Sequence, residues 1–149
     1  MSSSVSELLS QKLTTPVHSI SESSSVLDAI KNMSTYRIGC LTVTQEDATI
    51  RGIISEQDIF RRMAAVQEDL SQVPVRDVMT TEVIVCSPAD TINTVQSIMK
   101  THSIRQVPVV ADDGKLLGII SMENINAHLI TEEELEIKFL HDYVEGRVR

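Results

Sequence analysis

Apolar residues recur at helical spacing in two separate stretches of the chain, 25–36 and 91–102. They are Val26, Ala29, Ile30 and Met33 in the first stretch, and Ile92, Val95, Ile98 and Met99 in the second. Because residues three and four apart share one face of an α-helix, both stretches are predicted to form amphipathic helices. Ser24 or Ser25 is a suitable N-cap for the first of them.

Each predicted helix is followed by two short apolar runs joined by a polar turn, a pattern typical of a β-hairpin. The runs cover 40–43 and 50–54 in the first half, and 106–110 and 115–120 in the second. A further helix is predicted after each hairpin, over 56–66 and 122–130. The partly apolar segments 17–20 and 83–86, expected to be strands or extended linkers, lie in front. Each half therefore has the order β-α-β-β-α.

The two halves are copies of one unit. When the chain is aligned with itself without gaps, from 17/83 to 62/128, 12 of the 46 pairs are identical, and Gly52-Ile53-Ile54-Ser55 matches Gly118-Ile119-Ile120-Ser121. A unit of about 50 residues has too little core to fold alone. We therefore expect an α/β (α+β) fold in which two repeats pack sheet to sheet with pseudo-two-fold symmetry.

The repeat gives a prediction for the domain boundaries. An N-terminal extension covers 1–13, the first repeat 14–67, a linker 68–75 and the second repeat 76–130. A separate C-terminal helix is predicted over 131–149. Thr131 followed by Glu134 has the pattern of a capping box at the start of that helix.

Composition excludes several classes of function. The net charge of −8 disfavours nucleic acid and anionic membranes, and no apolar run is long enough to cross a bilayer. Neither a catalytic motif nor a metal-ligand spacing occurs, so no enzyme activity, no catalytic cofactor and no metal site are expected. Cys40 and Cys86 are predicted to be reduced thiols of a cytoplasmic protein.

The motif Gly-apolar-apolar-Ser-x-x-Asp at Gly52–Asp58 resembles the ligand signature of CBS (cystathionine-β-synthase) domains. The segments 78–80 and 105–110 are also similar to patterns of that family. The resemblance implies a tandem CBS pair, or Bateman module, which is a stand-alone and non-catalytic regulatory protein. Such modules bind AMP, ADP, ATP, NAD or S-adenosylmethionine between the repeats and act on an enzyme or transporter, which the sequence does not identify.

Ten residues are candidates for this ligand site. A carboxylate accepts strong hydrogen bonds from the vicinal hydroxyls of a ribose, a role suited to Asp58. Ser55 lies where a strand meets a helix, and Gly52 allows close backbone approach. Alternatively, Ser55 and Asp58 only cap a helix. The other candidates are Ile38, Gly39 and Cys40 beside the base, Arg37 and Arg105 near the phosphates, and Ser121 and Asn124 in the second repeat.

The second repeat departs from the motif, because Asn124 replaces the aspartate. An amide has one oxygen, so we expect it to accept from one ribose hydroxyl only and the two sites to be unequal. The second site is then weak, empty or specific for a different ligand. Gln57 departs as well, since many stand-alone members have a basic residue at that position. A scaffold that has kept the fold and lost the ligand is therefore the alternative function.

Surplus apolar surface predicts a homodimer. The helix over 56–66 carries an apolar stripe, and the helices over 122–130 and 131–149 carry others. A two-fold dimer covers such patches. The alternative is that the C-terminal helix covers them within one chain.

Overall fold

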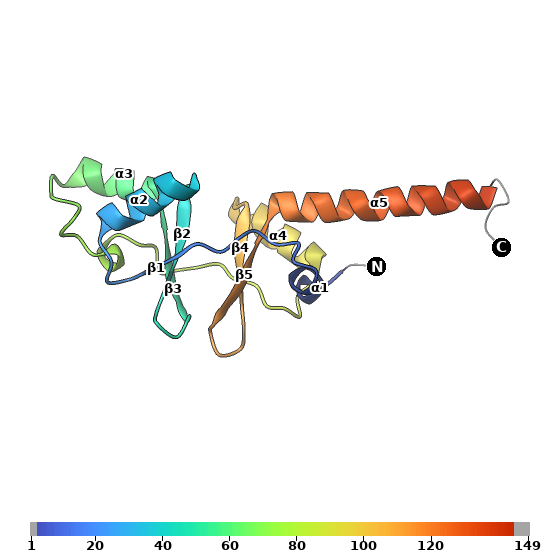
Figure 1. Ribbon diagram of the computed structural model, residues 1–149, viewed down its shortest axis with the longest axis horizontal. Helices are drawn as coiled ribbons and strands as arrows, with labels where there is room; N and C mark the ends of the chain where they lie inside the picture. The colour runs from blue at the N-terminus through green and yellow to red at the C-terminus, as the bar shows by residue number, and fades with distance from the viewer. Residues whose placement is uncertain (1–2, 145–149) are drawn as a thin grey trace. The chain divides into compact units, whose positions relative to one another are not determined.

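The computed structural model describes the backbone of residues 3–144, and the side chains of 3–130, 133, 136–138 and 140. The chain divides into two compact units (Figure 1). Unit 1 comprises Met1–Thr15, Pro88–Val107 and Ile119–Arg149, and unit 2 comprises Pro16–Ser87 and Pro108–Gly118. Within the described residues, no helix has the length and apolar character needed to cross a membrane.

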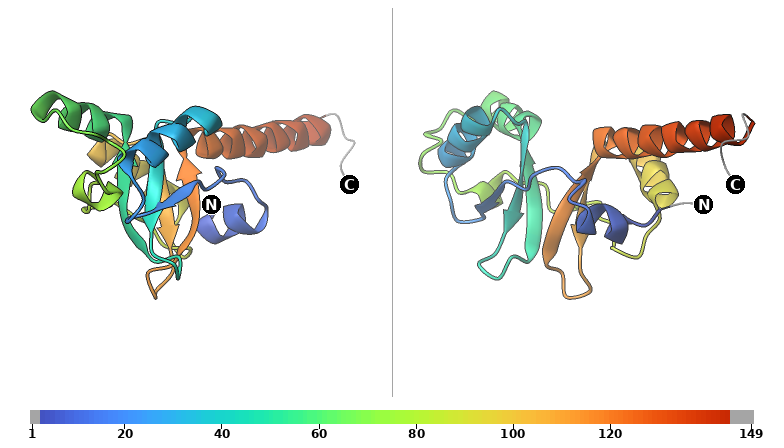
Figure 2. Two further views of the ribbon diagram at one scale, coloured as in Figure 1. Left: turned by 60° about the vertical axis from the view of Figure 1, so that its left-hand side comes forward. Right: turned by 45° about the vertical axis from the view of Figure 1, so that its right-hand side comes forward.

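Unit 2 contains the first repeat in the predicted order. Strand β1 (Ser19–Ser21) is followed by α2 (Val26–Tyr36), β2 (Cys40–Thr44), β3 (Ile50–Ser55) and α3 (Glu56–Ala65), and a short 3₁₀ turn, η1 (Val75–Asp77), comes later. The sheet order is β1-β2-β3, in which β1 is parallel to β2 and β2 is antiparallel to β3. Helices α2 and α3 lie on the same side of this sheet (Figure 2).

Unit 1 contains the helices of the second repeat, α4 (Ile92–His102) and α5 (Met122–Val144), together with the N-terminal helix α1 (Val5–Ser10). The hairpin of β4 (Gln106–Val110) and β5 (Leu116–Ser121) begins and ends in unit 1, while its middle belongs to unit 2. Of the two expected forms, the segment 83–86 takes that of an extended linker, with one parallel bridge from Cys86 to Val109. The duplicated α/β architecture is thus confirmed.

The N-terminal segment and the linker, both expected to lie outside the repeats, supply hydrogen-bond acceptors to the first residues of α4 and α2. The Ile92 N–H donates to the Ser3 carbonyl at 2.8 Å, and the Val26 N–H donates to the Val73 carbonyl at 2.8 Å. The first N–H groups of a helix have no partner within it, so these bonds satisfy donors that would otherwise be unpaired. In helix α1, which follows Ser3 directly, Val5 and Leu8 are fully buried. The N-terminal segment is therefore part of the packed structure of unit 1.

The prediction of a separate C-terminal helix is wrong. Helix α5 runs without a break from Met122 to Val144, so residue 131 lies inside it and not at the start of a helix. Residues 122–144 include neither glycine nor proline. The sequence therefore contains no residue that would end the helix within this segment. The predicted extension to 149 falls outside the described residues from 145 onward.

Candidate functional site

Asp58 lies at the junction of β3 and α3, where it forms a reciprocal cap with Ser55. Asp58 Oδ2 accepts hydrogen bonds from the Ser55 backbone N–H and hydroxyl, both at 3.0 Å. In return, the Asp58 N–H donates to Ser55 Oγ at 3.2 Å. This capping box fixes the start of α3, as the alternative interpretation of these two residues predicts.

The second carboxylate oxygen of Asp58 faces other groups. Asp58 Oδ1 accepts a hydrogen bond from Thr80 Oγ1 at 3.2 Å, and Nη1 of Arg61 lies 3.7 Å away. The Asp58 side chain is 11% exposed. Because each carboxylate oxygen has two acceptor positions, Oδ2 is saturated and Oδ1 keeps capacity for one further donor. With its present contacts, Asp58 can accept from one ribose hydroxyl rather than from two.

Residues 79–80 pack so closely on Gly52 that this position requires a glycine. The Ile53 N–H donates to the Thr80 carbonyl at 2.9 Å, and the Thr80 N–H donates to the Ile53 carbonyl at 2.8 Å. This pairing brings the segment 79–80 across Gly52, where a Cβ atom would lie 2.6 Å from the Thr80 carbonyl oxygen and 2.9 Å from the Met79 sulfur. The close backbone approach expected at Gly52 is therefore made by residues 79–80, which also carry Thr80 to Asp58.

Cys40 is the candidate that the structure places next to this carboxylate. It pairs with Ser55 across β2 and β3 and is half-buried. Burial raises the pKa of the Cys40 thiol, and the negative charge of Asp58 raises it further. Cys40 takes part in no disulfide, so it is a protonated, weakly reactive thiol beside Asp58.

The remaining candidates of the first repeat line a different cavity. Arg37, Ile38 and Gly39 border a space of about 660 Å³ between α2 and α3, which neither Ser55 nor Asp58 lines. Arg37 has a left-handed backbone (φ 54°) and ends α2. The other lining residues are Ile30, Met33, Ser34, Glu56, Ile59, Phe60 and Met63.

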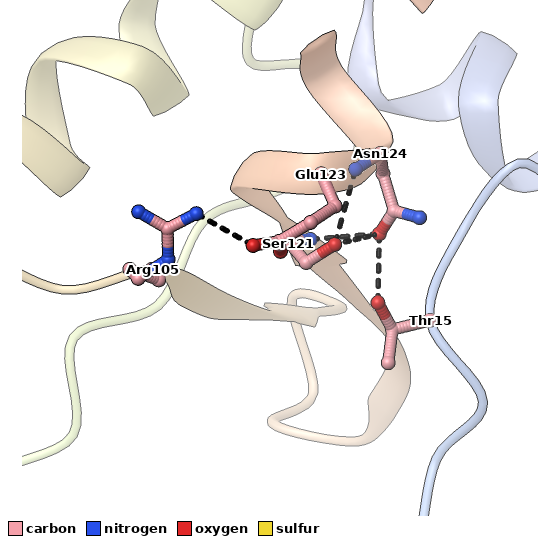
Figure 3. Close-up of polar contacts among 5 residues, drawn as sticks. All are labelled: Thr15, Arg105, Ser121, Glu123 and Asn124. Atoms are coloured by element: carbon pink, nitrogen blue, oxygen red, sulfur yellow. Dashed lines mark hydrogen bonds and ion pairs between the residues drawn. The ribbon is translucent and has the colours of Figure 1, made fainter. Parts of the chain in front are cut away.

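A matching polar cluster surrounds Asn124 at the start of α5 (Figure 3). Asn124 Oδ1 accepts from the Ser121 N–H at 2.8 Å, from Ser121 Oγ at 2.7 Å and from Thr15 Oγ1 at 2.8 Å. The Asn124 N–H donates to Ser121 Oγ at 3.1 Å. Three protein donors therefore occupy the one amide oxygen. In this arrangement the Asn124 oxygen has no acceptor position left for the expected ribose hydroxyl.

Arg105 contacts the first turn of α5 next to the Asn124 cluster, whereas Arg37 has no equivalent role at the start of α3. The Met122 N–H donates to the Arg105 carbonyl at 2.8 Å, just as the Glu56 N–H donates to the Gly39 carbonyl at 2.9 Å. Arg105 is thus the counterpart of Gly39. Its guanidinium is paired with Glu123 at 2.6 Å, and this contact lowers the pKa of the Glu123 carboxyl (Figure 3).

Sequence reasoning missed the two threonines that complete the clusters. Thr15 is paired with Ile119 as Thr80 is paired with Ile53. The ungapped alignment places Ile53 on Ile119 but places Thr15 on Thr81 instead of Thr80, so it hides the equivalence of the two threonines. Comparing the two segments after moving one of them by a single position would have revealed it. In the part of the chain that the structure describes, no group of His, Cys, Asp or Glu is arranged to hold a metal ion.

Comparison with known proteins assigns both halves to one family. The CBS domain model matches residues 5–65 and 75–130. The mitochondrial CBS domain-containing protein CBSX3 of Arabidopsis thaliana is 29% identical over 125 residues, which are 81% of this chain and 60% of that protein. The chain thus spans less than two thirds of that relative.

Solved structures agree with this assignment. The CBS-domain containing protein ATU1752 of Agrobacterium tumefaciens is 29% identical, with a TM-score of 0.70 over 85% of this chain and 93% of that one. The CBS domain pair of MJ0100, solved in complex with 5′-methylthioadenosine and S-adenosyl-L-methionine, has a TM-score of 0.70 at 23% identity and covers 89% and 99%. Two matched domains on a duplicated fold place this chain in the CBS domain family, as a tandem pair.

Proposed function

We propose that the chain is a non-catalytic regulatory module that binds an adenosine-type nucleotide and transmits the ligand state to a partner protein. The ligand class comprises AMP, ADP, ATP, NAD and S-adenosylmethionine. The observation that carries the proposal is Asp58 Oδ1, an oxygen of a mostly buried side chain that keeps one unused acceptor position and lies within the first matched CBS domain. The two adenosine ligands of the MJ0100 pair support this chemistry.

The Asp58 cluster suits a ribose hydroxyl for electrostatic reasons. A hydroxyl that donates to a carboxylate forms a stronger bond than one that donates to a neutral acceptor. Thr80 Oγ1 donates to the same oxygen and keeps lone pairs that can accept from the sugar. The carboxylate is already held by Ser55, so little side-chain entropy is lost on binding.

A thermal-shift panel of the five ligands tests the proposal. A ligand at about 100 times its dissociation constant stabilises the fold by about 2.7 kcal/mol, which raises the melting temperature by roughly 5–10 °C. Asp58→Ala is expected to abolish most of that shift while the apoprotein stays folded. A flat response to every ligand would favour the alternative, a scaffold in which Asp58 only caps α3.

We also propose that two chains form a homodimer through the α2–α3 face. Phe60 and Met63 are 63% and 53% exposed, and both border the apolar cavity between these helices. Ile137 and Leu140 on α5 are 60% and 57% exposed. Apolar side chains that are this exposed and grouped on helices are typical of a protein interface.

Light scattering at micromolar concentration is expected to give the mass of two chains, and Phe60→Asp is expected to reduce it to one. Leu117→Asp is the matched control, because Leu117 is 49% exposed on β5 and outside this face. The control variant is expected to remain dimeric. A wild-type mass of one chain that does not change with concentration would contradict the dimer.

A further inference from the structure

Helices α2 and α3 border the cavity of about 660 Å³ with two matching faces, which together form the α2–α3 groove (Figure 2). The lining residues follow the spacing of one helix face on each side, at positions 30, 33, 34 and 37 along α2 and its C-cap, and at 56, 59, 60 and 63 along α3. Each face is therefore two turns, or about 10 Å, long. Phe60 and Met63 line the groove although they are largely exposed, so the groove is open to solvent.

The second half of α5 carries an apolar stripe of similar length. Ile130, Ile137 and Leu140 are 54%, 60% and 57% exposed, and their spacing of i, i+7 and i+10 places them on one face of the helix. Glu133, which is also exposed, lies on the same face at i+3. This half of α5 extends beyond the other helices of unit 1 (Figure 1). The distance along the helix from Glu133 to Leu140 is about 10 Å, which matches the length of the groove.

The shapes of the two surfaces favour contact of the stripe with the groove. Helices pack by placing the side-chain ridge of one into the groove of another, and an amphipathic helix fills a hydrophobic groove in this way. Two copies of the groove facing each other would enclose a void instead. Because the side chains around a void lose their contacts, such an arrangement is less stable than one in which a third helix fills the space.

The charges of the two surfaces are complementary as well. Arg37 lines the groove where α2 ends, and Glu133 interrupts the apolar stripe. Glu56 lies at the same end of the groove as Arg37, since its N–H donates to the Gly39 carbonyl. Within the part of the chain that the structure describes, none of these three charged side chains belongs to an ion pair. A charged residue in an apolar helix stripe fixes the register with a partner, and Arg37 is the partner that the groove offers to Glu133.

We infer that each α2–α3 groove receives α5 of a second copy of the chain, so that the two chains exchange their C-terminal helices. This inference rests on the proposed homodimer and names the segment that fills the groove. With Glu133 beside Arg37, the side chains of Ile137 and Leu140 lie along the groove, and α5 runs parallel to the partner's α3. The two contacts are equivalent, which closes the assembly at two chains.

Sedimentation velocity of the full chain at a series of concentrations tests the helix contact. Leu140→Asp is expected to raise the dissociation constant of the dimer at least tenfold, because the carboxylate would have to enter an apolar groove. Lys138→Asp is the matched control, since it places the same residue on another face of α5. The control is expected to change the dissociation constant by less than threefold.

An exchange of charges tests whether the contact joins two chains. Arg37→Glu and Glu133→Arg are each expected to weaken their own dimer at least tenfold, since like charges then face each other in both contacts. An equimolar mixture of the two variants is expected to recover the wild-type dissociation constant within threefold. In the mixed dimer, one contact is native and the other has the same pair of charges reversed.

The outcomes separate this inference from the homodimer on which it rests. If wild type has the mass of one chain at every concentration, both fall. If wild type is dimeric and Leu140→Asp weakens the dimer less than tenfold, or no more than Lys138→Asp does, the inference is wrong and the homodimer stands. A mixture of the two charge variants that dimerises no better than either alone would also overturn the inference.

Discussion

Leu8→Ala is expected to lower the free energy of unfolding by about 2–5 kcal/mol, although the repeat pattern of the sequence predicts residue 8 to lie before the first repeat. Leu8 is fully buried, and α1 is tied to unit 1 through the bond from the Val5 N–H to the Asp90 carbonyl at 2.9 Å. Removing three side-chain carbons leaves a cavity that the surrounding structure fills only in part. Urea unfolding followed by circular dichroism measures the loss.

Leu13→Ala is the matched control for that experiment. Leu13 has the same side chain in the same segment, but it is 43% exposed. Its loss is expected to cost less than about 1 kcal/mol, as is usual for substitutions at exposed positions. Equal effects of the two variants would show that the N-terminal segment does not pack on unit 1 as described.

Gly52→Ala is expected to lower the free energy of unfolding by about 1–3 kcal/mol, the usual cost of overpacking. The added methyl would lie 2.6 Å from the Thr80 carbonyl oxygen. A backbone atom cannot move away from such a contact as easily as the end of a flexible side chain can. Since the segment 79–80 positions Thr80, the same variant is expected to weaken nucleotide binding at Asp58.

Gly39→Ala provides the comparison for Gly52. The nearest atom to a Cβ at Gly39 is the Glu56 carboxyl carbon at 3.5 Å, an ordinary contact. This variant is expected to be neutral or to gain up to about 1 kcal/mol, because alanine restricts the unfolded chain. Thermal unfolding of both variants gives the comparison, and a Gly52→Ala protein as stable as wild type would contradict the close approach of Thr80.

The helices and hairpins could be predicted because periodicity reports local structure. Ser25 caps α2, and Met33 and Met99 are buried at the helical positions that the pattern indicates. The error at Thr131 has a physical cause, since a capping-box pattern has no effect where the preceding residues already form a helix. The packing of α1 was not visible because its partners, such as Asp90, belong to a distant part of the chain.

The candidate site could be predicted only in part. The Ser55–Asp58 and Ser121–Asn124 pairs follow from local spacing, and the structure brings each pair together. Their threonine partners come from distant segments, and no local pattern marks them. From the sequence, Arg37 and Arg105 are expected together near the phosphates, although the structure aligns Arg105 with Gly39. Spacing along the chain does not show which side chains share a cavity.

A crystal structure of the chain with the ligand that gives the largest thermal shift tests the central claim most directly. The account predicts a ribose hydroxyl within about 3 Å of Asp58 Oδ1, with the bonds from Ser55 to Oδ2 retained. A nucleotide bound elsewhere, with Asp58 still contacting only Ser55, Thr80 and Arg61, would contradict it.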